Sequence, residues 1–115
     1  MPFEIAPITK APPIRKAPFQ HYADAILRGC AMSKPLIGDL LRLREDGIQA
    51  CALGAMALGF GVAPTRDAAI GFCCMTVSAS LVSNAYAARY GRSIERDNDD
   101  HGYAREEIAA RIAAL

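Results

Sequence analysis

The amino-acid sequence predicts an all-α fold, a compact bundle of about five helices that follows a proline-rich extended N-terminal arm. Two long stretches without a formal charge, residues 48–61 and 68–88, have the length and composition of buried helices. Five prolines within the first eighteen residues prevent a continuous helix or central strand there. We therefore divide the chain into an extended arm, residues 1–19, and a helical domain, residues 20–115.

Composition limits the class of protein. The chain of 115 residues, 52% hydrophobic and 22% charged, has the size and balance of one globular domain. Its formal net charge of +1 provides no strong long-range field and its basic residues are scattered, which disfavours a nucleic-acid partner. The four cysteines lack the Cys-x-x-Cys spacing of metal or redox sites, so a reduced, cytoplasmic protein is predicted.

The N-terminal arm carries apolar residues between its prolines, and a purely flexible linker does not normally contain so many of them. Two interpretations stay open. The arm either lies across its own domain or is disordered in solution, or it docks as an extended segment onto another subunit or a partner protein. The candidate partner-binding residues are Phe3, Ile5, Ile8, Ile14 and Phe19, and a weak basic cluster consists of Lys10, Arg15 and Lys16.

Two short helices are predicted to follow the arm. In residues 21–32, apolar side chains recur at helical spacing, which favours an amphipathic helix. In residues 35–44, a proline in the first turn and Ser33 before it fit a helix start, and the leucines that follow form one apolar stripe. An acidic turn at residues 45–47 ends this second helix.

Residues 48–61 form the predicted central helix, which should be buried because it has no charged face. Gly54 and Gly59 each cost about 1 kcal/mol relative to alanine, which indicates close approach by a neighbouring backbone. The predicted neighbour is a long helix that starts at the Thr65 cap, ends at Gly91 and packs through a ridge of mostly small side chains. That ridge consists of Met75, Ala79, Ser83 and Ala87.

The main alternative for part of that long helix is a strand within residues 72–82, where valine and threonine raise the β-propensity. Residues 92–102 form the most polar segment and are expected at the surface. Residues 103–115 are predicted to form the last helix, with an apolar stripe that contains Ile108 and Ile112.

Two motifs carry a resemblance to a known family. Residues 46–55 contain a Cys-Ala-x-Gly-Ala motif after an Asp-Gly turn, and the pair Asn98-Asp99 precedes a C-terminal helix. In these features the chain resembles, over roughly residues 46–112, an uncharacterised family of small bacterial and phage proteins. Ala104 stands where the family pattern has a capping serine or threonine, and the arm has no counterpart in that pattern. Since the family has no established activity, the resemblance implies a fold, and an origin in a phage or mobile element, more than a function.

The polar loop at residues 97–101 is the candidate site for chemistry, through Asn98, Asp99 and His101. The run from Asp97 imitates the first half of a calcium-binding loop, but its twelfth position is an isoleucine instead of a bidentate glutamate. The histidines have no ligands at zinc spacing, and burial should suppress the reactivity of the cysteines in apolar runs. No catalytic residue, metal or cofactor is therefore expected, and Asn98 and Asp99 are predicted to cap nearby backbone N–H groups.

These observations predict a small, non-enzymatic interaction protein that acts by self-association or by docking to a protein partner. Two alternatives from other classes stay open. One is a small membrane hairpin, in which residues 48–63 and 68–88 would both enter a bilayer. The other is a ligand-binding or enzymatic domain that uses the loop at residues 97–101. A secretory signal peptide is not expected, because prolines interrupt the apolar region that such a segment needs.

Overall fold

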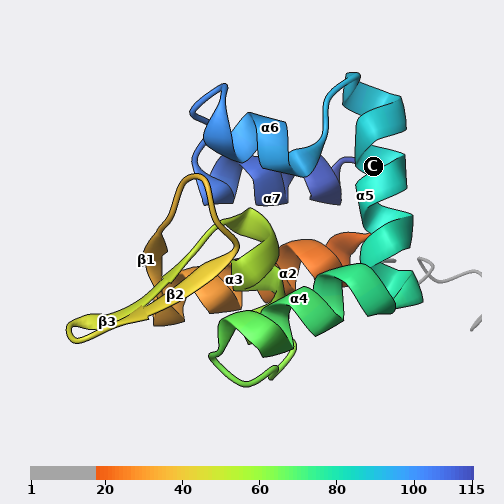
Figure 1. The fold of residues 1–115 in the computed structure, drawn as a ribbon. Helices are drawn as coiled ribbons and strands as arrows, with labels where there is room; N and C mark the ends of the chain where they lie inside the picture. Colours follow the sequence, from red (N-terminus) through yellow and green to blue (C-terminus); the bar gives the residue numbers. More distant parts are fainter. Residues whose placement is uncertain (1–17) are drawn as a thin grey trace, which may run out of the picture.

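The structure is a computed structural model that describes residues 18–115, and this part of the chain contains six helices and a three-stranded sheet (Figure 1). The helices are α2 (Gln20–Met32), α3 (Ala52–Gly59), α4 (Arg66–Met75), α5 (Val77–Tyr90), α6 (Ile94–Asp99) and α7 (Arg105–Ala113). The strands are β1 (Lys34–Pro35), β2 (Leu41–Arg44) and β3 (Gly47–Ala50).

The small mixed sheet shows that the predicted all-α fold is wrong. Residues 35–44, predicted as a helix, form β1, a loop and β2, and β3 pairs parallel with β1 and antiparallel with β2. The loop contains Gly38 at a φ of 83°, which no helix accommodates. Leucine and arginine alternate in β2, and an Asp-Gly turn follows, which together predict a hairpin. The leucines of residues 35–44 also recur at helical spacing, and this second pattern led to the wrong prediction.

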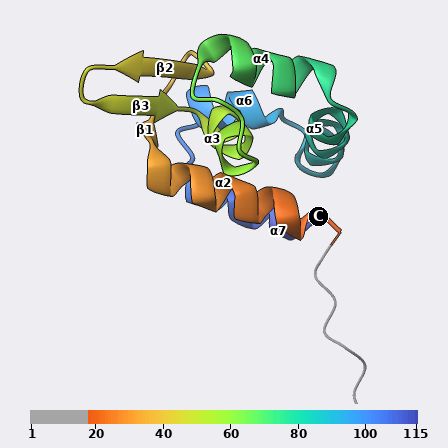
Figure 2. The same ribbon diagram turned by 90° about the horizontal axis from the view of Figure 1, so that it is seen from below.

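The central helix α3 is shorter than predicted, because the first three residues of the expected segment belong to β3. Every residue of α3 from Ala52 to Leu58 is buried. A helix that is apolar all round must be covered on all sides, and α2, α4, α6 and α7 all contact α3. Figure 2 shows α3 between α4 on one side and the neighbouring pair α2 and α7 on the other.

The closest helix contact in the core joins α2 to α3, so the predicted core pair of residues 48–61 with the long helix that follows is wrong. A Cβ added at Gly29 would lie 1.8 Å from the Ala55 carbonyl oxygen. A Cβ added at Gly59 would lie 1.8 Å from the Ala25 carbonyl oxygen. The two helices thus touch backbone to backbone at two reciprocal positions, which only glycine permits.

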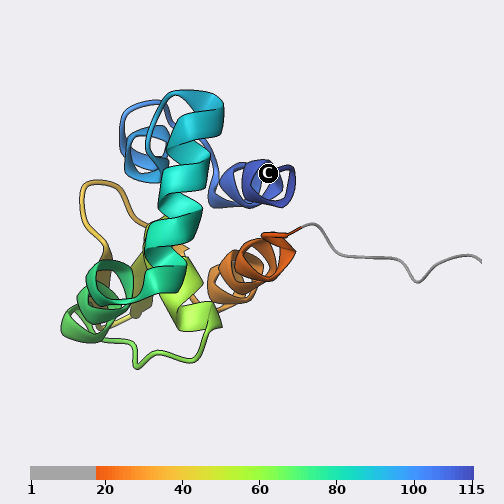
Figure 3. The same cartoon turned by 90° about the vertical axis from the view of Figure 1, so that its right-hand side faces the viewer.

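The predicted long helix is broken at Thr76 into α4 and α5, which meet at 70° (Figure 3). The Thr76 hydroxyl donates to the Phe72 carbonyl oxygen at 2.6 Å and accepts from the Ala79 N–H at 3.3 Å. Thr76 is therefore both the C-cap residue of α4 and the N-cap residue of α5. No strand lies in residues 72–82. Among residues 18–115 no single helix is long and apolar enough to cross a membrane, and α4 with α5 meets that test only as a bent pair.

The C-terminal part contains one helix that the sequence predicts and one that it does not. The last predicted helix is confirmed as α7, with Ile108 and Ile112 fully buried. Residues 92–102, expected as a polar surface segment, include α6, whose start is capped by the Ser93 hydroxyl. Charged residues of α6 face inward as well as outward, since the Asp97 side chain is fully buried.

Replacing Gly29 by alanine should lower the free energy of unfolding by about 1–3 kcal/mol or more, because the new Cβ overlaps the Ala55 carbonyl oxygen. Gly71→Ala in α4 is the matched control, since nothing lies within 4 Å of an added Cβ there. That control should stabilise the protein by about 0.5–1 kcal/mol through helix propensity. Urea unfolding measures both variants, and equal midpoints would contradict the close α2–α3 contact.

Candidate functional site

The predicted partner-binding residues Phe3, Ile5, Ile8 and Ile14 lie outside the described residues. Phe19 is described and forms the N-cap residue of α2, half-buried against the hydrophobic core. Its ring lies 5.8 Å from the Tyr22 ring, and its carbonyl oxygen accepts from the Tyr22 N–H at 3.1 Å. Phe19 therefore belongs to the folded domain, and the arm that remains available for docking ends before it.

Asn98 and Asp99 make long-range contacts instead of the predicted local caps. The Asn98 Oδ1 atom accepts from the Ala52 N–H at 3.1 Å, and its Nδ2 donates to the Leu36 carbonyl oxygen at 2.9 Å. The Asp99 carboxylate accepts from the Gly38 N–H at 3.0 Å. The pair ends α6 and ties it to the start of α3 and to the loop before β2. Sequence reasoning identified the residues but assigned them the wrong partners.

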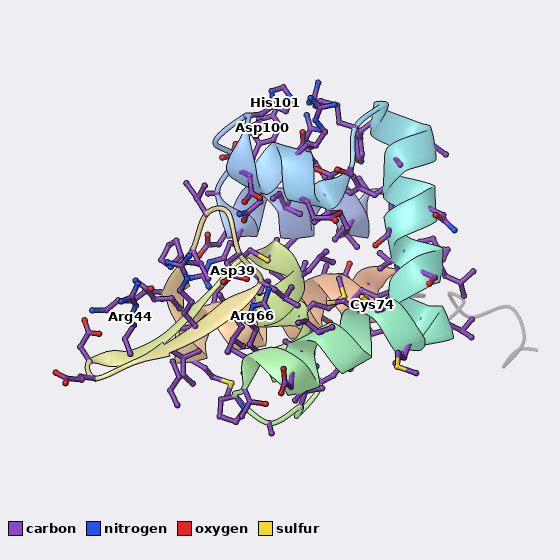
Figure 4. All side chains as sticks on the ribbon, in the orientation of Figure 1. Asp39, Arg44, Arg66, Cys74, Asp100 and His101 are labelled. Atoms are coloured by element: carbon purple, nitrogen blue, oxygen red, sulfur yellow. The ribbon has the colours of Figure 1, made fainter. Side chains whose placement is uncertain are left out.

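His101 does not join Asn98 and Asp99 in a shared site. Figure 4 shows His101 beside Asp100 at the outer edge of the molecule, and both residues are exposed. Within residues 18–115 no three His, Cys, Asp or Glu side chains are grouped so that they could hold a metal ion. Residues 97–101, predicted as a loop, are the end of α6 and the two residues after it, and their oxygen atoms bond mainly to the protein's own backbone and side chains.

The buried Asp97 carboxylate is the centre of a charged network among α5, α6 and α7. It accepts hydrogen bonds from the Tyr86 hydroxyl at 2.5 Å and from the Arg92 Nε at 2.6 Å, and it pairs with Arg111 at 3.5 Å. Burial acts to raise the pKa of the Asp97 carboxyl, but these donors outweigh it and hold the pKa below its usual value. Arg92 and Arg111 also share the Tyr103 hydroxyl as an acceptor.

Arg105, at the first turn of α7, is a second buried charge with a structural role. Its guanidinium donates to the Ser33 hydroxyl at 2.8 Å, to the Ser33 carbonyl oxygen at 2.9 Å and to the Ala50 carbonyl oxygen at 3.3 Å. These bonds join the end of α2 and the end of β3 to the start of α7. Its Nε atom is buried and has no hydrogen-bond partner within the described residues.

Three cysteines line a cavity of about 290 Å³ beside the start of α3, together with Asp39, Glu95 and Asp99. Cys51 is the N-cap residue of α3, and its Sγ accepts from the Gly54 N–H at 3.4 Å. Burial raises the pKa of the Cys51 thiol and raises that of Cys73 to about 12. A thiol with so high a pKa is a poor nucleophile at neutral pH. The predicted burial of Cys51 is confirmed, while its capping role was missed.

The two most exposed large apolar side chains of the described residues, Met75 and Val77, lie where α4 meets α5, and Leu81 follows on α5. The exposed fractions are 84% for Met75, 76% for Val77 and 54% for Leu81. We call these three residues the elbow surface. Val77 and Leu81 lie four residues apart on one face of α5, while Ala79 and Val82 occupy its buried face. Sequence reasoning placed Met75 in the core, because nothing in the local pattern reveals the bend at Thr76.

Comparisons with known proteins find no matching family model, no matching curated protein and no matching solved structure. The resemblance to a family of small bacterial and phage proteins therefore stays a prediction.

Asn98→Ala should lower the free energy of unfolding by about 1–3 kcal/mol, because it leaves the buried Ala52 N–H and Leu36 carbonyl without partners. Asp100→Ala is the control, since Asp100 makes only an exposed pair with Arg96. Guanidinium unfolding of both variants tests this. If Asp100→Ala lowered the free energy of unfolding as much as Asn98→Ala, the hydrogen bonds of Asn98 to Ala52 and Leu36 would not explain the loss.

Asp97 should make stability fall in acid. A folded-state pKa below the unfolded value of about 3.9 stabilises the protein above that pH and loses this contribution as the pH falls through the folded value. Asp97→Asn removes the titrating group but keeps an acceptor for Tyr86. The gap in unfolding free energy between wild type and variant should therefore be large at pH 7 and shrink towards pH 3. A gap independent of pH would contradict the charged role of Asp97.

Proposed function

We propose that this protein is a non-enzymatic interaction protein that self-associates, with the N-terminal arm of one copy docked on the elbow surface of another. The observation that carries the proposal is the cluster of exposed apolar side chains at Met75, Val77 and Leu81. Transfer of apolar surface out of water contributes about 25 cal/mol per Å², so a group of exposed apolar side chains at one helix junction favours a partner.

The shape of the elbow suits an extended segment. Thr76 interrupts the helix, so the apolar side chains project from the end of α4 and the first turns of α5 at different angles. The exposed face of α5 continues beyond Leu81 with Asn84 and Ala88, which are small or uncharged. An apolar surface without charges offers an extended apolar segment no electrostatic penalty.

The arm has the chemistry that this surface requires. Its prolines exclude a helix, and its isoleucines and phenylalanine supply apolar side chains at intervals along an extended chain. Figures 1 and 2 place the start of α2, where the arm joins the domain, and the junction of α4 and α5 at the same end of the molecule. Seventeen residues at about 3.3 Å each reach across a domain of this size to a neighbouring copy.

The interior supports an interaction role more than a catalytic one. The buried charged groups Asp97 and Arg105 are bonded to the protein's own elements, and burial suppresses the thiols of Cys51 and Cys73. The described cysteines are all free thiols, which supports a reducing, cytoplasmic setting as part of this proposal.

Removal of residues 1–17 should reduce the mass in solution from an oligomer to a monomer and leave the helical content of the rest unchanged. Leu81→Glu in the full chain should do the same, because it places a charge on the surface that the arm would cover. Ile37→Glu is the matched control, since Ile37 is 64% exposed but lies in the loop before β2. Light scattering coupled to size exclusion measures the masses.

A direct readout uses a labelled peptide of residues 1–17 added to the truncated protein. Fluorescence anisotropy should show binding that Leu81→Glu weakens at least tenfold, about 1.4 kcal/mol, and that Ile37→Glu leaves unchanged. A monomeric full chain that loses thermal stability on truncation would mean that the arm covers its own domain and would overturn self-association.

A further inference from the structure

A groove separates the β2 strand from the start of α4, on a part of the molecule distinct from the elbow surface. It has a volume of about 500 Å³ and is lined by all four residues of β2 together with Pro64, Thr65 and Arg66. Figure 2 shows β2 as the outermost strand, on the same side of the molecule as α4. The floor of the groove is thus a sheet edge and its far wall is a helix start.

The β2 strand has a free edge. Within residues 18–115 it pairs only with β3, in the strand order β1-β3-β2. The Cys51 N–H donates to the Leu40 carbonyl oxygen at 3.1 Å, which marks that pair as hydrogen-bonded, so by alternation Arg42 and Arg44 also bond to β3. The main-chain groups of Leu43 then point away from β3, and 66% of Leu43 is exposed. An incoming strand can reach those groups.

Every charged residue that lines the groove is an arginine: Arg42, Arg44 and Arg66. Arg42 and Arg66 share one carboxylate, Asp39, at 3.3 and 3.0 Å. A hydrogen bond from the Leu40 N–H and another from Arg66 hold the pKa of Asp39 below its usual value, so it is charged at neutral pH. Arg44 bonds to the Gln49 amide oxygen at 3.4 Å and has no carboxylate partner within the described residues. Two of the three guanidinium groups therefore share one carboxylate, and the third has no ion pair to a carboxylate among the described residues.

Figure 4 shows how these groups are spread along the groove. Asp39 and Arg66 lie together between the sheet and α4, and Arg44 lies further out along the hairpin. The guanidinium groups of Arg42 and Arg44 stand two residues apart on one face of β2. That spacing matches the spacing of alternate side chains on a second strand laid beside the first.

We propose that this groove binds an extended acidic segment of a partner protein, which adds a strand to the free edge of β2 and places alternate carboxylates on the arginines. Strand addition supplies affinity through the main chain, and side chains at every second position supply specificity. Arginine suits this role because its planar guanidinium can bond a carboxylate through two N–H groups.

The protein's own arm does not have the chemistry for this groove. Its basic residues Lys10, Arg15 and Lys16 outnumber its one acid, Glu4, so the arginines would repel it. A nucleic acid is also disfavoured, because tight phosphate binding draws on more than three basic contacts and a nucleotide chain has no peptide backbone to pair as a strand with Leu43.

The test uses a fluorescein-labelled synthetic peptide of alternating glutamate and valine, titrated with the full chain in fluorescence anisotropy. Arg44→Gln should weaken binding at least tenfold, and raising the salt from 0.05 to 0.5 M should weaken it further. Arg89→Gln is the matched control, because Arg89 is exposed on α5 and stacks on Tyr90, away from the groove. Equal binding of the same peptide with lysine in place of glutamate, or tighter binding of a single-stranded oligonucleotide, would overturn the acidic-peptide assignment.

Strand addition is tested separately at Leu43. Leu43→Pro removes an N–H that faces the free edge and makes no bond to β3, so the hairpin is retained while pairing with the peptide is lost. Leu43→Ala keeps that N–H and is the matched control. Binding should fall at least tenfold in the proline variant and much less in the alanine variant, with unchanged circular dichroism in both. In the wild type, the peptide should slow hydrogen exchange at the Leu43 amide. Equal binding by the two variants, or exchange that the peptide leaves unchanged, would overturn strand addition.

Discussion

Burial of α3 on every side is the constraint on which the rest of the structure depends. A helix of alanine, leucine, methionine and glycine has no face for water, so other elements must cover it completely. Small residues then let those elements approach very closely, as Gly59 does against the Ala25 carbonyl. The same burial denies water to the first N–H groups of the helix, and an unpaired buried N–H costs about 1–3 kcal/mol.

Each of those N–H groups has a partner from within the protein. Asn98 accepts from Ala52, the Cys51 sulfur accepts from Gly54, and the Cys51 carbonyl accepts from Ala55 at 2.8 Å. Burial raises the pKa of the Cys51 thiol, and the backbone N–H groups of Gly54 and Leu53 act against this larger effect to lower it. The two motifs on which the predicted family resemblance rests thus meet at one place, since the cysteine of the first and the asparagine of the second cap the same helix. Both residues accept hydrogen bonds from backbone N–H groups at the buried start of α3.

Polar chemistry elsewhere in the described chain follows the same logic. Asp97 and Arg105 are buried charges, and each joins elements that lie far apart in the sequence. The two features that we propose for binding lie at the surface, one apolar and one charged. The elbow surface is uncovered because Thr76 turns α5 away from α4. The groove beside β2 is open because no fourth strand from residues 18–115 closes the sheet. We propose an extended apolar segment for the first feature and an extended acidic segment for the second.

The sequence by itself determined the helices at each end of the domain, the burial of the Cys-Ala-Leu-Gly-Ala segment and the interruption of the first eighteen residues by proline. These follow from local periodicity, side-chain size and the missing proline N–H, which need no knowledge of distant residues. The hairpin could also be predicted locally, because the Asp-Gly turn and the alternation of leucine and arginine in β2 are hairpin signals. The helical spacing of the leucines led instead to the prediction of a helix.

Only the tertiary structure decided which helix meets α3, where the long apolar stretch breaks, and which groups the side chains of Asn98, Asp97 and Arg105 bond to. Glycine and alanine permit close contact with any neighbour, so their presence in α3 did not distinguish α2 from α5 as the partner. The polar side chains of α6 bond to groups up to 62 positions away in the sequence. Local sequence patterns do not show which such distant groups will become neighbours. The exposure of Met75 and Leu81 has the same origin, because an apolar side chain is buried only where another element comes to cover it.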